Sequence, residues 1–241
     1  MGTVDIVTKE YMRENAIFAD VFNYLIYGGK KVIDPAGLTE VDTATSAVGK
    51  KDALQKYRDV LKAAVIKQDE KMSYVLLGVE NQTDVHYAMP VRNAIYALQY
   101  GKQVSDIAAG HRRSQKDYSG KTGGEYLSGF LKEDHIKPVI TLVIHFGAEE
   151  WDGPLSLHEM MPIRDMEILS YVENYRIHLI DPAKLTEEEL NKFSTSMREV
   201  MGYIKYSNNK EKLLDFLRTD THKSIEMNAA RVIKTITKTP I

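Results

Sequence analysis

Residues 58–82 read RDVLKAAVIKQDEKMSYVLLGVENQ, and this stretch decides the fold. Two apolar runs, residues 58–66 and 72–81, flank the charged segment KQDEK. Apolar runs rich in β-branched residues and separated by a short polar segment are typical of a β-hairpin. In an antiparallel hairpin, the start of one strand lies beside the end of the other. Asp59 is therefore predicted to face Glu80 across the hairpin.

The second of these strands ends in polar residues. Glu80 and Gln82 are two positions apart, so they share one face of the strand. With Asp59 opposite, two carboxylates and an amide meet at one end of the sheet. Hard oxygen ligands of this kind suit Mg²⁺, or another divalent cation such as Mn²⁺ or Ca²⁺. From the spacing alone, an ordinary strand end with a surface Arg58–Asp59 ion pair is the favoured interpretation.

The composition narrows the class of protein. The chain has 241 residues, of which 43% are hydrophobic and 27% charged, proportions typical of a globular protein with a sizeable core. The absence of cysteine excludes disulfide and cysteine–zinc frameworks. No apolar run approaches the ~20 residues of a membrane span, and no signal peptide is recognisable. We therefore expect a cytoplasmic protein without a membrane partner. The net charge of −2 excludes a uniformly basic chain but allows a local basic patch.

The remaining elements are predicted from periodicity and from glycine and proline positions. Helices are expected over residues 9–27, 51–57, 88–109, 186–205, 209–219 and 221–236. Further strands are expected over residues 138–146 and 175–180, and the glycine-rich segment 110–124 is predicted to be a loop. Strands alternating with helices in this order indicate an α/β fold, with a mixed sheet flanked by helices.

Residues 57–100, which include the hairpin, resemble the Rpn-like recombination-promoting nucleases, a family also described as putative transposases. Three further blocks carry the same resemblance: NAIFADVFNYLIY, PVITLVIHFGAEEWDGPLSLHEM and FSTSMREVMGYIKYS. The similarity extends over about residues 9–235. It implies a PD-(D/E)xK nuclease core of α-β-β-β-α-β order over residues 9–181, with a helical C-terminal extension over 182–241 packed on it.

The resemblance also implies an activity, that of a metal-dependent DNA endonuclease associated with recombination or mobile elements. Asp59 and Glu80 match the two acidic residues of the superfamily signature and would hold the metal. Gln82 stands where the superfamily has lysine, so it can orient the attacking water but brings no positive charge. Members often add an acid from the first helix, which here implies Asp20 as a metal ligand, or else Glu14. From the residues alone, a position of Asp20 on the polar flank of an amphipathic helix is the favoured interpretation.

A basic cluster provides candidate contacts to DNA phosphates, which arginine and lysine bind without reading sequence. Its members are Arg112, Arg113, Lys116 and Lys121. The alternative is a solvated helix end, where the helix dipole alone favours cations. Arg92 and Lys102 are weaker candidates for the same role, and Asp42 is a remote candidate for the metal site.

Two functions of other classes stay open at this point. A DNA-binding module with a degenerate nuclease site would bind DNA in a salt-dependent manner without cleaving it. A non-enzymatic interaction protein would instead expose a large apolar patch on its helical tail and form oligomers through it. A homodimer is compatible with the nuclease as well, so oligomeric state alone does not separate these functions.

Overall fold

The computed structural model describes residues 2–41, 44–46, 55–57, 59–68, 71–114, 120–218 and 225–238. The helices are α1 (Thr3–Arg13), α2 (Asn15–Tyr27), α3 (Met89–Tyr96), α4 (Leu98–Arg113), α5 (Gly123–Ser128), α6 (Met166–Leu169), α7 (Glu187–Leu190), α8 (Met197–Tyr206), α9 (Lys210–Arg218) and α10 (Met227–Thr237). The strands are β1 (Leu38–Glu40), β2 (Ala44–Ser46), β3 (Gln55–Tyr57), β4 (Val60–Gln68), β5 (Lys71–Gln82), β6 (Val139–His145) and β7 (His178–Ile180). Short 3-10 turns lie at η1 (Pro35–Gly37), η2 (His158–Met160) and η3 (Pro182–Lys184).

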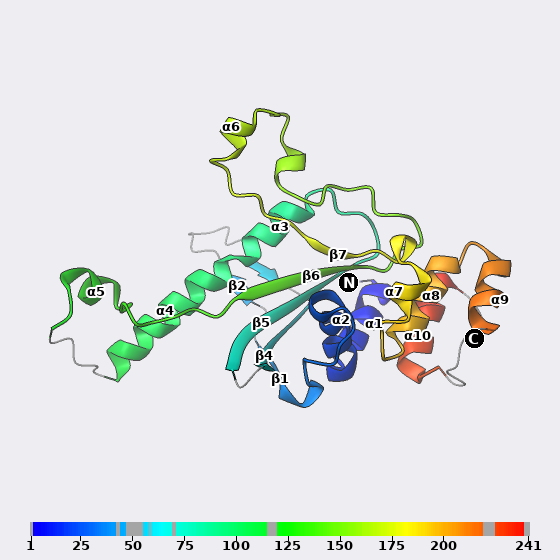
Figure 1. Cartoon of the computed structure of the whole chain (residues 1–241), viewed down its shortest axis with the longest axis horizontal. Helices are drawn as coiled ribbons and strands as arrows, with labels where there is room; N and C mark the ends of the chain where they lie inside the picture. The colour runs from blue at the N-terminus through cyan, green and yellow to red at the C-terminus, as the bar shows by residue number, and fades with distance from the viewer. Residues whose placement is uncertain are drawn as a thin grey trace.

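A mixed five-stranded sheet of order β1-β4-β5-β6-β7 forms the centre of the protein (Figure 1). β4 and β5 pair in antiparallel fashion, with Val60 opposite Val79, which confirms the predicted hairpin. β6 runs parallel to both β5 and β7. β5 is therefore the central strand, and this register places Asp59, which directly precedes β4, at the level of Glu80.

Different elements cover the two faces of the sheet. On one face, Leu77 and Val79 of β5 belong to a large core that they share with α1, α2, α8 and α10. On the other face, Val143 of β6 packs in a smaller cluster with Met89 of α3 and Trp151. Successive residues of β5 thus point to different layers, and Glu80 points to the α3 side.

The C-terminal helices pack against the N-terminal ones. α10 contacts both α1 and α8, and α2 contacts α8, so helices from opposite ends of the chain lie side by side (Figure 1). α3 and α4 lead away from this group toward α5, and the segment that carries α6 projects from the body between β6 and β7. A mixed α/β sheet flanked by helices, as predicted, is confirmed. The domain boundary near residue 181 stays a prediction.

Several predicted helices are interrupted. The helix expected over residues 9–27 divides at Glu14, whose backbone is extended (φ −63°, ψ 123°), and α1 begins earlier, at Thr3. The helix expected over 186–205 becomes α7 and α8, which are separated by residues 191–196. The predicted helix over 88–109 divides near Ala97, and its second part continues to Arg113.

Three further predictions were wrong in part. Residues 55–57 form strand β3, paired with β2, although their spacing favoured a helix; residues 51–54 lie outside the described chain. Strand pairing overrides a weak helical pattern in such short segments. The predicted loop 110–124 begins with the last turn of α4 and ends inside α5, which Thr122 caps. The helix expected over residues 221–236 begins only at Met227.

We predict that Gly202→Ala destabilises the protein by about 1–3 kcal/mol, because it overpacks a filled core. A Cβ at this position of α8 would lie 2.2 Å from Cζ of Phe216 on α9. Phe216 is 3% exposed and its ring lies next to Tyr206 and Arg198, so the ring must leave these contacts to make room for the added methyl group. Urea unfolding monitored by circular dichroism measures the change.

Gly101→Ala is the matched control for this substitution. Gly101 is also helical, but a Cβ there meets nothing within 4 Å. Alanine favours the helix by up to roughly 1 kcal/mol relative to glycine, so this variant should be as stable as the wild type or more so. Equal destabilisation of both variants would contradict the proposed packing of Phe216 over Gly202.

Candidate functional site

Glu80 is fully buried near the end of β5, at 0% exposure. The hydroxyl group of Tyr96 donates a hydrogen bond to its Oε1 atom. Nη2 of Arg92 lies 2.9 Å from its Oε2 atom, and Nε of Arg92 donates to the Tyr96 hydroxyl at 3.0 Å. Arg92 and Tyr96 are four residues apart on α3, so both project from one face of that helix. A closed triad of Glu80, Arg92 and Tyr96 therefore joins β5 to α3.

Asp59 lies beside this triad and is less enclosed. Its Oδ2 atom accepts a hydrogen bond of 2.7 Å from the backbone N–H of Asn81. Burial raises the pKa of Asp59, and this effect outweighs the opposing influence of the Asn81 hydrogen bond and of the charges on Lys9 and Arg92. The raised pKa means that the folded protein carries the Asp59 carboxylate at a cost in free energy.

A pocket of about 320 Å³ opens at this strand end. It is lined by Asp5, Asp59, Asn81, Gln82, Thr83, Asp84, Val85, His86 and Arg92. Arg92 is the only arginine or lysine among these residues. The structure therefore brings Asp59, Gln82 and Arg92 to one cavity, while Glu80 lies behind Arg92.

Two side chains of the pocket wall carry buried polar atoms that lack a hydrogen-bond partner in the described part of the chain. Both polar atoms of the Asn81 side chain are of this kind, and so is Nδ1 of His86. Asn81 is 7% exposed. Buried polar groups are nearly always paired, so unpaired ones in a cavity wall are features of a site that receives a polar ligand or water. No local pattern in the sequence marks either side chain, or Tyr96, as part of a site, because only the fold places them together.

The residue types at the pocket fit a divalent cation. The carboxylates of Asp59 and Glu80 are hard oxygen donors of the kind that Mg²⁺ prefers. In the described ranges, no three His, Cys, Asp or Glu side chains are grouped as metal ligands, so such an ion would need water or substrate oxygens as well. Glu80 is also inaccessible while Arg92 is seated on it. The donor set thus fits a metal ion in kind, and its exposure depends on Arg92.

Asp20, the metal ligand implied by the resemblance, is not among the residues that line the pocket at the end of β5. Its carboxylate, 3% exposed, accepts hydrogen bonds from four donors, the backbone N–H and hydroxyl groups of Ser194 and Thr195, at 2.6–3.0 Å. Asp20 therefore ties α2 to the segment before α8. The other candidate from the first helices, Glu14, accepts a hydrogen bond from Asn228.

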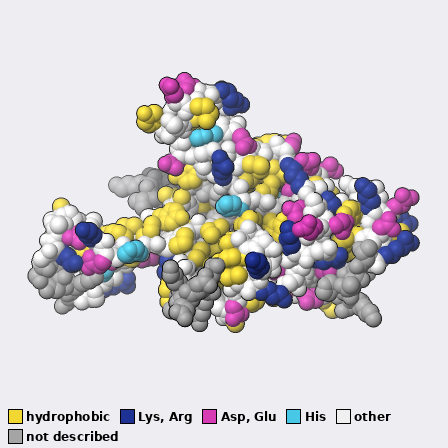
Figure 2. Space-filling view, in the orientation of Figure 1, with side chains coloured by type: hydrophobic (Ala, Val, Ile, Leu, Met, Phe, Trp, Pro, Cys, Tyr) yellow, Lys and Arg dark blue, Asp and Glu magenta, His cyan; other side chains and the backbone are white. Residues whose placement is uncertain are grey.

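Of the described residues predicted to contact DNA, Arg112, Arg113 and Lys121 do not line this pocket, whereas the weaker candidate Arg92 does. Arg112 and Arg113 occupy the last turn of α4, whose 16 residues span about 24 Å, and the pocket is near the α3 end. Lys121 forms an ion pair with Glu133 at 2.8 Å, which offsets its charge. Lys116 and Asp42 lie outside the described residues. Among the coloured side chains in Figure 2, cations and acids are interspersed over the C-terminal helices.

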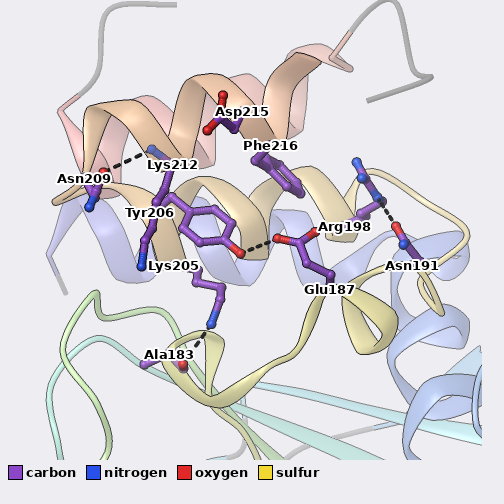
Figure 3. Close-up of a pocket in the computed structure, with 10 residues that line it drawn as sticks. All are labelled: Ala183, Glu187, Asn191, Arg198, Lys205, Tyr206, Asn209, Lys212, Asp215 and Phe216. Carbon is purple, nitrogen blue, oxygen red and sulfur yellow. Dashed lines mark hydrogen bonds between the residues drawn. The ribbon is translucent and has the colours of Figure 1, made fainter. Parts of the chain in front are cut away.

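A larger pocket, of about 760 Å³, lies between α7, α8 and α9 (Figure 3). Its polar side chains bond mainly to one another. Nε of Arg198 donates to Asn191 at 3.0 Å, Nζ of Lys205 donates to the carbonyl of Ala183 at 2.9 Å, and Tyr206 donates to Glu187. These contacts fix the C-terminal helices. The smaller pocket, with its unpaired polar atoms and its carboxylates, is the better candidate site.

Comparison with known proteins assigns the chain to a family. The model of the family described as "Putative transposase, YhgA-like" matches residues 9–230, which is most of the chain. No curated protein and no solved structure matches. No helix in the described part of the chain is long and apolar enough to cross a membrane. The matched range includes the hairpin, α3 and α8, so it contains every residue of the candidate site except Asp5.

We predict that substitutions separate the two buried aspartates by their effect on stability. Asp20→Asn should destabilise the protein by about 2–3 kcal/mol, because hydrogen bonds to a charged group are lost and an amide NH₂ then faces N–H donors. Asp59→Asn should instead stabilise it at pH 7, because the cost of burying the charge disappears. Thermal and urea unfolding measure both changes.

The pH dependence of the Asp59→Asn effect provides a second test. A carboxyl group whose pKa is raised in the folded state stabilises the fold below its unfolded pKa and loses that contribution as the pH rises through its folded pKa. The gain from Asp59→Asn should therefore be small below about pH 3.8, the ordinary value for aspartate, and should grow above it. A gain that shrinks with rising pH would contradict the assignment.

Proposed function

Because the chain belongs to the YhgA-like putative transposase family, we propose that it acts on DNA as a metal-dependent endonuclease that hydrolyses phosphodiester bonds. The observation that carries this proposal is the pair of acidic residues at one end of the β4–β5 hairpin. Asp59 faces the pocket, and Glu80 lies directly behind it at the adjoining strand position. The mixed sheet with helices on both faces supports a PD-(D/E)xK core, which stays part of the proposal.

The residues of the site have distinct roles in this proposal. Asp59 and Glu80 would hold the divalent ion, which would supply Lewis-acid polarisation of the phosphoryl group and a lowered pKa of water. Tyr96 fixes the orientation of the Glu80 carboxylate through its hydroxyl group. Gln82, at the pocket surface, orients the attacking water through its amide. Because Gln82 is neutral, the positive charge facing the phosphate comes from Arg92, whose planar guanidinium suits phosphate oxygens.

A second function is favoured by one specific observation. Glu80 is sealed by Arg92, and Gln82 replaces the lysine that the resemblance leads one to expect. A DNA-binding module that has lost catalysis would show both features. The two functions differ in a measurable way, because the module binds DNA without cleaving it, and its affinity falls as salt concentration rises.

We predict that the purified protein nicks supercoiled plasmid in the presence of Mg²⁺ or Mn²⁺ and not in EDTA. Asp59→Asn and Glu80→Gln should each lower the rate at least about 100-fold, because the metal supplies several kcal/mol of transition-state stabilisation. Both substitutions keep the shape of the side chain. Gly101→Ala, which meets nothing within 4 Å, is the control and should cleave at the wild-type rate.

Three other results would change the assignment. Cleavage that persists in both acid variants would indicate a contaminating nuclease or a site elsewhere in the chain. Binding of plasmid without cleavage under any metal would favour the DNA-binding module. Neither binding nor cleavage would favour an interaction protein, for which the oligomeric state in solution becomes the next measurement.

A further inference from the structure

Arg92 and Tyr96 enclose the Glu80 carboxylate, and this enclosure is an obstacle to metal binding. The residue is fully buried, and each of its carboxylate oxygens already faces a partner, Tyr96 on one side and Arg92 on the other. A metal ion that coordinates Glu80 must lie about 2 Å from one of these oxygens. No solvent reaches the carboxylate in this arrangement, so no ion reaches it either. One of the two partners has to move.

Arg92 is the partner that is able to leave. The Arg92 side chain is 28% exposed and lines the pocket, whereas Tyr96 is fully buried. Arg92 lies in the first turn of α3, so its long side chain can swing into the pocket without any change in the helix. Tyr96 would stay in place and continue to orient Glu80.

The charges at the pocket also indicate that Arg92 is the group that a metal ion displaces. Among the described residues that line the pocket, Arg92 is the only arginine or lysine, and it faces the Glu80 carboxylate at 2.9 Å. Burial alone would lower the pKa of Arg92, but Glu80, Tyr96 and Asp59 together outweigh burial and raise it, so the side chain stays charged. A divalent ion placed beside a seated guanidinium would meet like-charge repulsion at short range.

We propose that Arg92 is the resident cation of this site, and that a divalent metal ion binds Glu80 only by taking the place of the Arg92 guanidinium. This exchange deepens the endonuclease proposal and rests on it for the identity of the metal site. The displaced guanidinium turns into the pocket, where a DNA phosphate offers it a bidentate partner. Each negative group then keeps a positive partner, with Glu80 on the metal and the phosphate on Arg92. Arg92 is thus a positioning residue that couples metal entry to DNA.

A metal titration monitored by thermal unfolding tests the exchange of Arg92 for a metal ion and does not depend on catalysis. The probes are Mn²⁺ and Ca²⁺ alone, titrated into wild-type protein and into Arg92→Met, which keeps the aliphatic length of the side chain but not its charge. The variant is expected to bind either ion at least roughly tenfold more tightly, because the ion no longer has to displace the guanidinium. Its melting temperature should therefore rise more steeply with ion concentration than that of the wild type.

Two more variants keep the test decisive. Arg92→Met with Glu80→Gln removes both charges, so it should fold without metal and lose the tighter binding. Arg92→Lys retains a charge on a mobile side chain and should bind the ions with intermediate affinity, which provides a reading if Arg92→Met folds poorly without metal. Equal affinity in wild type, Arg92→Met and Arg92→Lys would overturn the proposal. Weaker binding in Arg92→Met or Arg92→Lys than in wild type would also overturn it.

The ion affinities of the Arg92 variants and the plasmid cleavage assay test different proposals. Tighter ion binding in Arg92→Met with no cleavage by any form would leave the exchange standing and remove the endonuclease proposal. Cleavage by the wild type with unchanged ion affinity in the Arg92 variants would leave the endonuclease standing and remove the exchange.

Discussion

The buried carboxylate of Glu80 is the constraint on which this end of the protein depends. A charge on the central strand, fully enclosed, is tolerated only with a partner of opposite charge and with its hydrogen bonds satisfied. Arg92 provides the opposite charge and Tyr96 donates a hydrogen bond, both from a single face of α3. One acidic residue of β5 therefore fixes how α3 sits on the sheet, and α3 in turn forms one wall of the pocket beside Asp59.

The parts of this arrangement that follow from local patterns could be predicted from the sequence. The hairpin is such a part, because its register follows from the alternation of side chains and from the position of the turn. The contact between Asp59 and the end of β5 follows from that register. The interruption between α7 and α8 does not, because Ser194 and Thr195 donate their backbone N–H groups to Asp20, a residue 174 positions away in the case of Ser194. No local window contains such a contact.

Asp20 and Asp59 show why residue type alone could not define the site. Asp20 lies in an apolar segment and Asp59 directly follows Arg58, and the family resemblance implied both as metal ligands. Asp20 is surrounded by four donors that hold its charge, so its negative charge is already used within the fold. Asp59 has one backbone donor and a raised pKa, so its charge is poorly compensated and available to a cation. What separates the structural acid from the candidate ligand is how completely each charge is compensated, which only the fold reveals.

The position of Arg92 implies a step that the signature residues alone do not indicate, the displacement of Arg92 from Glu80 when metal binds. A neutral Gln82 leaves the pocket without the positive charge that a lysine would bring, and Arg92 on the next helix supplies one while it also closes Glu80. Under the proposed exchange, a metal ion makes Arg92 available to phosphate, and a phosphate makes Glu80 available to metal. Each ligand then strengthens the binding of the other by the same factor, as linkage requires. The charge that seals the site in the free protein would thus be what makes metal and DNA bind together.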